Sequence, residues 1–485
     1  MEDDAADTDI ETDLCIIGAG AAGLSVAAGA SQMGARVVLI EKTIRDGVMG
    51  GECLHTGCVP SKAMLAAAKQ AKAMTQAGRF GIAPVTPQVD FSAVLDHVHG
   101  VIEAISPADT VERFEGLGVS VMEGEAAFVD PKTVMIEGMA VRAKRFVIAA
   151  GSRPAIPPIP GLERSSYLTN ETIFDNRDLP RHLIIIGGGP IGMELAQAHR
   201  RLGAEVTVLE RLTVLPNDDP ETRAVVTDRL KAEGVDIREN VEIQAILEGG
   251  AGEIHARCEI DGAKVVVTGS HLLVAAGRQP DLESLNLDAA GVAYTSRGIT
   301  VDGHLRTSNK RIYAIGDCAD GGPRLTHMAG YQASVVVQNI LFRRPAKSNP
   351  ALVPAVTYTD PEIAQVGLSE AAARERHKDI EVVTWPVADN DRAQADRDTE
   401  GLIKVVARKN GKILGVSIAA PNAGELIQPW LLALTWGKGL SSMTGFVAPY
   451  PTLGEISKRV AGKFYTPFLF GPRVKGIVRL LLRLP

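Results

Sequence analysis

The chain has 485 residues, which is too long for one hydrophobic core and predicts two to four domains. With 45% hydrophobic and 22% charged residues it has the composition of a soluble globular protein. A net charge of -7 argues against a nucleic-acid-binding protein, which needs a basic face. No apolar run is long enough to span a bilayer, and the acidic start is unlike a secretory signal. We therefore expect a cytoplasmic protein, with residues 1–10 as a disordered acidic tail.

A glycine-rich fingerprint follows the first apolar run of the chain. Residues 14–17 are typical of a buried strand, a helix is expected to end near residue 32, and a second strand over 37–40 leads to Glu41. The glycines of the G-x-G-x-x-G pattern are Gly18, Gly20 and Gly23. In a βαβ unit they permit a tight turn, the approach of a pyrophosphate to the helix N-terminus, and close helix–strand packing. Glu41 is then placed to accept hydrogen bonds from a ribose.

The same unit recurs further along the chain. A strand over 183–186 precedes the second fingerprint, and a strand over 206–209 leads to Glu210. The second set of glycines is Gly187, Gly189 and Gly192. Two complete units predict two dinucleotide-binding domains. A carboxylate at Glu210 favours NADH over NADPH, because it accepts the ribose 2′-OH and repels a 2′-phosphate, although Arg211 could soften this preference.

Two close cysteines, Cys53 and Cys58, follow the first unit and precede the second. Five cysteines are too few for a disulfide scaffold, and only these two are paired by their spacing. In a reducing compartment the pair indicates redox chemistry or metal binding. A helix N-terminus and Lys62 can lower a thiol pKa here. We expect no metal, because a second Cys/His pair is missing. The order of motifs suggests electron transfer between a nicotinamide, a flavin and a disulfide.

The remaining elements predict a mixed α/β chain, and the pattern of expected strands and helices changes after residue 349. A helix is expected over 95–117, with short strands over 119–141. Later strands are expected over 353–367, 380–387 and 402–419, and helices over 371–376 and 424–434. This last region has no phosphate loop, which favours a role in dimerisation. Residues 466–485 form a separate basic tail.

The motifs together resemble those of the FAD-dependent pyridine nucleotide-disulfide oxidoreductases, which include dihydrolipoamide dehydrogenase, glutathione reductase and mercuric reductase. The resemblance covers residues 11–465 and includes the redox loop 53–62, crossover strands 148–154 and 274–280, a second FAD motif 307–317, and the interface-domain opening 358–362. It implies an α/β fold with two Rossmann-like dinucleotide-binding domains and a C-terminal α+β dimerisation domain. The implied boundaries are 11–158 with 281–348 for the FAD domain, 159–280 for the NAD(P)H domain, 349–465 for the interface domain, and 466–485 for a basic amphipathic tail.

The resemblance also implies FAD and NAD(P)H as cofactors of a homodimer that acts on a small molecule. Cys58 would contact the flavin, Cys53 would exchange with substrate, and Glu194 would pair with Lys62 beside the flavin. The implied FAD-binding residues are Gly18, Gly20, Gly23, Glu41, Lys42, Gly51, Lys62, Gly151 and Asp317. The implied NAD(P)H-binding residues are Gly187, Gly189, Gly192, Glu210 and Gly277.

The chain departs from this family at the C-terminal catalytic motif. Tyr450 replaces the histidine that, from the partner subunit, carries the proton of the exchange thiol, whereas Glu455 is kept. A phenol with a pKa of about 10 is a poor base at pH 7. His55 is one substitute, or merely a solvated loop residue. Mercuric reductases resemble this chain in having a tyrosine there, but this chain lacks their C-terminal cysteine pair. Pro190 occupies the position where some relatives have a tyrosine that covers the flavin. It suggests an ungated nicotinamide pocket, or it simply begins a helix.

The basic tail has two interpretations. It places Arg479 and Arg483 on one helical face and apolar residues on another, so it could lie on an anionic membrane or pack against its own dimer. The leading functional hypothesis is an NADH-dependent FAD enzyme that reduces, or oxidises, a small disulfide or dithiol at Cys53–Cys58. The alternatives are a metal-ion, quinone or dye reductase acting from the flavin, and a redox relay or sensor docked at a membrane or membrane protein.

Overall fold

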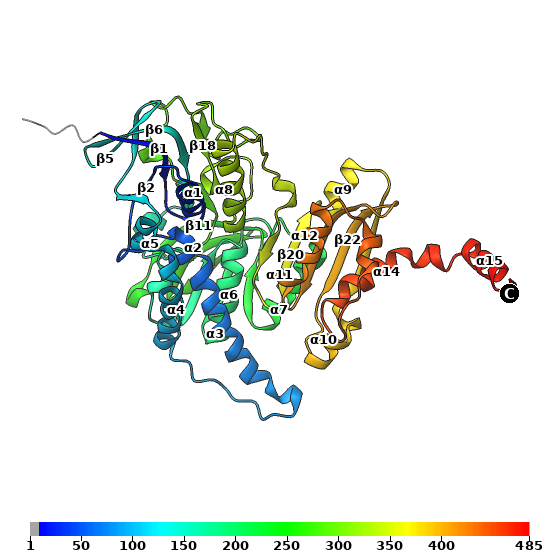
Figure 1. The fold of residues 1–485 in the computed structure, drawn as a ribbon. Helices are drawn as coiled ribbons and strands as arrows, with labels where there is room; N and C mark the ends of the chain where they lie inside the picture. Colours follow the sequence, from blue (N-terminus) through cyan, green and yellow to red (C-terminus); the bar gives the residue numbers. More distant parts are fainter. Residues whose placement is uncertain (1–8, 485) are drawn as a thin grey trace, which may run out of the picture.

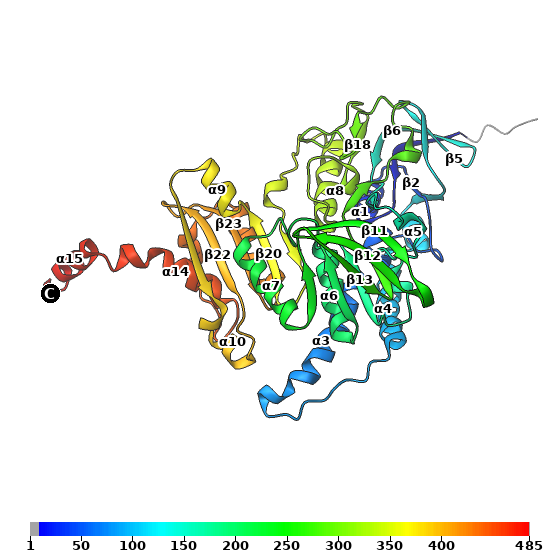
Figure 2. The same cartoon turned by 180° about the vertical axis from the view of Figure 1, so that it is seen from behind.

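The structure is a computed structural model that describes residues 9–484. The first eight residues of the predicted acidic tail lie outside the described residues, and the first strand already begins at Ile10. Two sheet-containing regions lie together in one body, and a third stands beside them (Figure 1). A helical arm at the C-terminus projects away from the third region (Figures 1 and 2).

The first region is built on a sheet in the order β3-β2-β1-β6-β5-β4, with β18 paired to β6. Its parallel strands are β1 (Ile10–Ile17), β2 (Val37–Glu41), β3 (Val119–Glu123), β6 (Met139–Ile148) and β18 (Ile312–Ala314). Its antiparallel edge is β4 (Ala127–Asp130) and β5 (Thr133–Ile136). Helices α1 (Ala21–Gln32) and α8 (Thr326–Leu341) pack together, and their apolar side chains join the core beneath the sheet. The first predicted βαβ unit is therefore present.

The second region repeats the unit with a smaller parallel sheet in the order β10-β9-β8-β14. Its elements are β8 (His182–Ile186), α6 (Pro190–Leu202), β9 (Glu205–Leu209), α7 (Pro220–Ala232), β10 (Val235–Arg238) and β14 (His271–Val274). An antiparallel sheet of β11 (Val241–Glu248), β12 (Ile254–Ile260) and β13 (Ala263–Gly269) joins it. The chain crosses between the two regions through the paired strands β7 (Ser152–Pro154) and β15 (Arg278–Pro280).

The third region is a five-stranded antiparallel sheet in the order β19-β20-β23-β22-β21. Its strands are β19 (Ala355–Thr357), β20 (Glu362–Gly367), β21 (Ile380–Pro386), β22 (Leu402–Arg408) and β23 (Ile413–Ala420). Its helices include α9 (Glu370–Arg376), α11 (Ala423–Leu426), α12 (Gln428–Thr435), α13 (Leu440–Gly445) and α14 (Glu455–Leu469). Trp430, which is fully buried, lies in its core.

The helix expected over 95–117 is divided. It consists of α4 (Phe91–Ile105), a 3-10 turn over 106–109, and α5 (Val111–Gly116). Pro107 cannot donate a backbone hydrogen bond, and Thr110 is extended, with a side chain that accepts a hydrogen bond from the Arg113 amide. Apolar periodicity runs through this break, which explains why the sequence pattern joined the pieces.

The C-terminal arm continues α14 beyond the predicted boundary at residue 465. Buried side chains in α14 end at Ala461, after which the chain turns at Gly471 into α15 (Pro472–Leu481). None of the residues of α15 is buried. Among the described residues, no helix is long and apolar enough to cross a membrane.

Candidate active site

A single large cleft runs between the two glycine loops and past the cysteine pair. Its volume is about 1820 Å³. The predicted site residues that line it are Gly18, Gly20, Glu41, Lys42, Gly51, Cys53, Cys58, Lys62, Gly151, Gly187, Gly189, Glu194, Glu210, Gly277 and Asp317. The third glycines, Gly23 and Gly192, lie behind the loops, where a Cβ atom would collide with the carbonyl oxygens of Gly18 and Gly187. These two positions therefore serve helix–strand packing, as the fingerprint predicts.

The loops themselves leave room for a ligand. Gly20 and Gly189 precede the first residues of α1 and α6, and an added Cβ atom would meet nothing within 4 Å at either. The same holds at Gly151 and Gly277, which follow β6 and β14. Helix N-termini and open backbone at the carboxyl ends of parallel strands suit the diphosphate of a dinucleotide.

The two predicted ribose-binding glutamates lie in matching positions. Glu41 accepts hydrogen bonds from the backbone amides of Ala19 and Thr43. Glu210 Oε2 accepts from the Gly188 amide at 2.7 Å, and its Oε1 accepts from the Leu212 amide at 3.0 Å. Each carboxylate is thus held at the mouth of its glycine loop by backbone donors.

The redox loop places the two cysteines on consecutive helices. Cys53 lies in the short helix α2 (Gly51–His55), and Cys58 is the first residue of α3 (Cys58–Gln76). Both are free thiols in this structure, and Cys58 Sγ lies 3.3 Å from Thr326 Oγ1. Thr326 begins α8, so the second half of the first region contributes a contact that the sequence did not reveal.

The environment makes the two thiols unequal. A hydrogen bond from Cys53, followed by one from Thr326 and the charge of Lys62, lowers the pKa of Cys58 to about 6. The same pairing with Cys58 and burial raise the pKa of Cys53. Cys58 is therefore the thiolate of the pair near neutral pH, and Cys53 holds the proton.

Lys62 is held by Ser61, Glu194 and Tyr358, and its Nζ donates to Ser61 Oγ at 3.3 Å. Its Nζ lies 2.8 Å from Glu194 Oε2, and it lies 4.4 Å from the centre of the Tyr358 ring. The Tyr358 amide donates to Glu194 Oε1 at 2.9 Å, which satisfies the second oxygen of this buried carboxylate. The predicted Lys62–Glu194 pair is formed, and the third region of the chain completes it.

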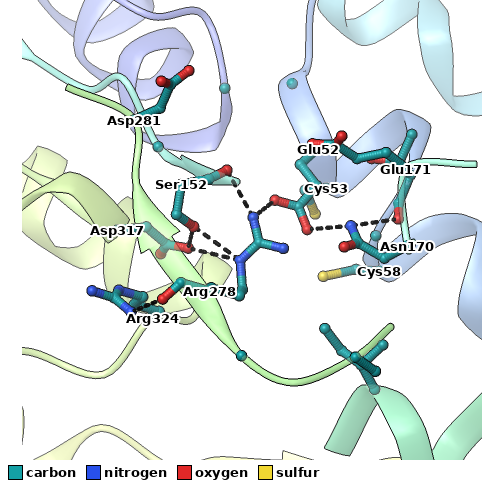
Figure 3. Close-up of a pocket in the computed structure, with 18 of the residues that line it drawn as sticks. Glu52, Cys53, Cys58, Ser152, Asn170, Glu171, Arg278, Asp281, Asp317 and Arg324 are labelled. Atoms are coloured by element: carbon teal, nitrogen blue, oxygen red, sulfur yellow. Dashed lines mark hydrogen bonds and ion pairs between the residues drawn. The ribbon is translucent and has the colours of Figure 1, made fainter. Parts of the chain in front are cut away.

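A second ionic network, which the sequence analysis missed, has Arg278 at its centre (Figure 3). Arg278 Nη2 donates to a carboxylate oxygen of Glu52, and Arg278 Nε donates to Ser152 Oγ at 2.9 Å. Ser152 Oγ donates in turn to Asp317 Oδ2 at 2.6 Å. On the other side, Asn170 Nδ2 donates to Glu52 Oε1 at 2.9 Å. No sequence motif predicts these contacts, because they join five separate stretches of chain.

Of the groups that could replace the missing histidine, His55 lines the cleft with the thiols, whereas Tyr450 and Glu455 do not line it in this chain. His55 Nε2 contacts the Met49 carbonyl oxygen at 2.6 Å, and burial lowers the pKa of its ring. Tyr450 is 68% exposed on the third region and donates to Asp391 Oδ2 at 3.0 Å, which raises the pKa of its phenol. Glu455 begins α14 and faces Arg459 at 3.7 Å. Neither Tyr450 nor Glu455 lines the cleft of its own chain.

The fold and the cleft define an oxidoreductase with two dinucleotide sites and a reactive cysteine pair between them. The chain belongs to the pyridine nucleotide-disulphide oxidoreductase family: the family profile matches residues 12–333, and the profile of its dimerisation domain matches residues 353–461. It is accordingly a flavoprotein enzyme that uses FAD and a pyridine nucleotide, and the dimerisation domain supports a homodimer.

Relatives span nearly the whole chain. A mercuric reductase from Staphylococcus aureus is 34% identical over 94% of this chain and 83% of its own length. A dihydrolipoyl dehydrogenase from Bacillus subtilis (strain 168) is 34% identical over 94% of this chain and 97% of its own length. Among solved structures, the Cu(II) complex of the HOCl-induced flavoprotein disulfide reductase RclA from Escherichia coli matches with a TM-score of 0.82 and 26% identity, covering 93% of this chain and 99% of that one.

The residues present fit both cofactors. The open glycine loops offer backbone to a diphosphate at each site, and Arg278 Nη1 is buried without a partner among the described residues. A buried guanidinium N–H without a partner, on a residue that lines this cleft, suits an anionic ligand. When bound, FAD supplies the two-electron chemistry that connects the nicotinamide with the disulfide.

Proposed function

We propose that this enzyme uses NADH to reduce a small disulfide or related electrophile through FAD and the Cys53–Cys58 pair, the reverse direction being oxidation of a dithiol. The observation that carries this proposal is the position of Cys58. It is a thiol of lowered pKa at the start of α3, in a cleft lined by both glycine loops. A redox relay between two nucleotides needs such a group, and a purely structural cysteine does not.

Each site residue has a proposed role. Cys53 exchanges with substrate, Cys58 faces the flavin, and the Lys62–Glu194 pair keeps a charge beside it. Asp317 binds the sugar chain of FAD, and Gly51 admits its diphosphate. The remaining residues of the proposed FAD site are Gly18, Gly20, Gly23, Glu41, Lys42, Lys62 and Gly151. Those of the proposed NAD(P)H site are Gly187, Gly189, Gly192, Glu210 and Gly277. Gly23 and Gly192 would act from behind the loops by allowing close helix–strand packing, and the others would face the cofactor. The domain boundaries of the sequence analysis are retained as part of this proposal.

We infer a preference for NADH from Glu210. Its carboxylate is held by the Gly188 and Leu212 amides at the end of β9, where a nucleotide ribose would lie. A fixed negative charge there accepts the 2′-OH and repels a 2′-phosphate.

We also propose that Tyr450 and Glu455 act on the partner subunit's cleft. In their own chain they are remote from the thiols, and Tyr450 is exposed on the region that matches the dimerisation domain. A phenol of raised pKa can donate a hydrogen bond to a bound anion or thiolate but is a poor base.

A metal-ion reductase is the second candidate function. The tyrosine at position 450 and the similarity to mercuric reductases favour it. No cysteine follows Cys318, so a metal ion would have to reach Cys53 and Cys58 directly. Among the described residues, no cluster of three or more His, Cys, Asp or Glu side chains suggests a resident metal.

One experiment tests these candidates together. The FAD-loaded wild type and Cys53→Ser are titrated anaerobically with NADH and then challenged with small disulfides, thiophilic metal ions and quinones. We expect a thiolate-to-flavin charge-transfer band in the reduced wild type, and the same band in Cys53→Ser without added reductant. Cys58→Ser should abolish it. A reduced wild type that shows only bleached flavin would contradict the relay, and turnover with quinones by all three proteins would indicate a reductase acting from the flavin alone.

We propose further that the C-terminal arm binds an anionic lipid surface. Helix α15 has Lys475 and Arg479, and Arg483 follows its end at the next fourth position. The apolar side chains of the helix are exposed, with Leu480 at 63%. There is no acidic residue after Glu455, whereas the whole chain has a net charge of -7. Basic residues beside a broad apolar face suit the boundary between lipid head groups and acyl chains.

Vesicle sedimentation tests the arm. The holoenzyme should sediment with vesicles that contain phosphatidylserine and not with vesicles of phosphatidylcholine alone. A Lys475→Gln/Arg479→Gln/Arg483→Gln variant should lose this binding, while Lys409→Gln/Lys412→Gln should keep it. If removal of residues 472–485 instead changes the oligomeric state and no vesicles bind, the arm contacts a second copy and the lipid proposal is wrong.

A further inference from the structure

Glu52 immediately precedes Cys53, and the proposed reaction gives it no role. It lies in α2, and its carboxyl group is held from two sides. Asn170 Nδ2 donates to Oε1 at 2.9 Å, and Arg278 donates to Oε2. The side chain is 31% exposed in the cleft. A carboxyl group fixed this firmly beside a redox centre responds to any change of charge there.

Arg278 is shared between two carboxylates. Its Nε lies 3.7 Å from Asp317 Oδ2, while its Nη2 contacts Glu52. One guanidinium cannot neutralise both, so the group of Glu52, Arg278 and Asp317 has an excess negative charge when both acids are ionised. Like charges at short range favour protonation of one member of the pair.

Reduction of the cysteine pair adds another negative charge to this cleft. The thiolate of Cys58 repels the Glu52 carboxylate, as do Asp317 and Glu171, whereas the charge of Arg278 and the hydrogen bond from Asn170 favour its ionised form. Lys62 stabilises the Cys58 thiolate only in part, because the charge of its partner Glu194 acts on that thiol in the opposite direction. Burial first, and then the charges of Asp317, Cys58 and Glu171, raise the pKa of Glu52 to about 7 against the opposing charge of Arg278.

We propose that Glu52 takes up one proton from solvent when the Cys53–Cys58 disulfide is reduced, and gives it up when the dithiol is reoxidised. This inference rests on the proposed function, since it requires the cysteine pair to be a redox couple. Glu52 thereby offsets the charge of the Cys58 thiolate and stores a proton for the second half of the reaction.

The step balances as follows. NADH supplies a hydride equivalent, that is two electrons and one proton; the S–S bond breaks, Cys53 becomes a thiol and Cys58 a thiolate. Water supplies the further proton that Glu52 binds. When a substrate disulfide reoxidises the pair, the S–S bond re-forms and the substrate leaves as two thiols. These need two protons, one from Cys53 and one from Glu52.

The state of the other acid/base groups explains why Glu52 would carry this proton. The partner histidine that the family uses is Tyr450 here, whose raised pKa keeps it protonated. His55 has its Nε2 at the Met49 carbonyl, and its pKa is lowered. Glu52 lines the cleft, is adjacent to Cys53 in the sequence, and has a pKa raised to about 7.

The proton is detected on the FAD-loaded holoenzyme. Proton uptake per two electrons is measured during anaerobic reduction at a series of pH values, together with a count of the thiols formed. Just below about pH 7 the wild type should bind up to one proton more than Glu52→Gln. The difference should vanish above pH 8, where Glu52 is ionised in both redox states, and again at low pH, where it is protonated in both. Asp396→Asn, which removes an exposed carboxylate that does not line the cleft, should behave like the wild type. Equal uptake by Glu52→Gln and wild type would overturn the inference.

A second measurement needs no variant. The reduced-minus-oxidised infrared difference spectrum of the wild type at pH 6.5 should contain the C=O stretch of a newly protonated carboxylic acid. Its absence would also overturn the inference, even if Glu52→Gln failed to fold. If no thiols appear on reduction, the proposed function itself fails. If thiols appear without the extra proton, only the role of Glu52 fails.

Discussion

Lys62 Nζ lies 2.8 Å from Glu194 Oε2, and this ion pair ties the helix that begins at Cys58 to the helix that begins at the second glycine loop. The pair connects the thiol site with the nucleotide site through two rigid elements. The Glu194 side chain is only 5% exposed, so its charge depends on its partners.

Glu194→Ala should therefore be costly. It removes the ion-pair partner of Lys62 and leaves the Tyr358 amide without an acceptor, and we expect a loss of about 1–3 kcal/mol in the free energy of unfolding. Chemical denaturation of the FAD-loaded protein measures it. The control is Asp396→Ala, which removes half of the exposed Arg392–Asp396 pair and should cost less than about 1 kcal/mol. Equal effects for the two variants would show that the Lys62–Glu194 pair is not energetically distinct.

The lowered pKa of Cys58 predicts a pH-dependent reactivity. In the reduced enzyme its alkylation rate should be high above pH 6 and fall as the pH drops through about 6, because only the thiolate is a nucleophile. Cys53→Ala should move the midpoint upward, since it removes the largest stabilising hydrogen bond, and Thr326→Val should move it less. Mass spectrometry of the alkylated site gives the midpoint. A midpoint near 9 in the wild type would contradict the assignment of Cys58 as the thiolate.

Glu210→Ala should weaken NADH relative to NADPH by about 1–3 kcal/mol, because a ribose hydroxyl loses its charged acceptor. Equilibrium binding of the two nucleotides gives the ratio. Arg211→Ala is the matched control and should shift the ratio the other way, since it removes a cation that could accept a 2′-phosphate. If both variants leave the ratio unchanged, nucleotide choice is determined elsewhere.

Tyr450 is expected to limit dihydrolipoamide oxidation. Tyr450→His should raise this activity, because an imidazole with a pKa of about 6.5 can accept the thiol proton whereas a phenol cannot. The pH profile of the rate should gain a limb near that pKa. Tyr450→Phe tests whether the hydroxyl matters for the true substrate. High dihydrolipoamide turnover by the wild type would contradict the prediction.

The sequence by itself determined the two dinucleotide-binding units and the redox loop. Fingerprint glycines are required locally: Gly18 and Gly187 adopt positive φ values of 100° and 110° beside a strand, which side chains rarely permit. Strand and helix periodicity around them is equally local, so both units appear where the pattern predicts them. The same short motifs carry the resemblance to the family, which the family profiles confirm.

Tertiary structure decided the contacts that join distant segments. Thr326 reaches Cys58 across 268 residues of chain, and Arg278 reaches Glu52 across 226. No periodicity or spacing encodes such pairs, because they arise only when separate elements close around one cleft. The break in the helix expected over 95–117 has a different reason, since its apolar stripe continues across Pro107 while the backbone cannot. Residue types at the loops identified the chemistry of the site, and the packing of the regions fixed the charges that tune it.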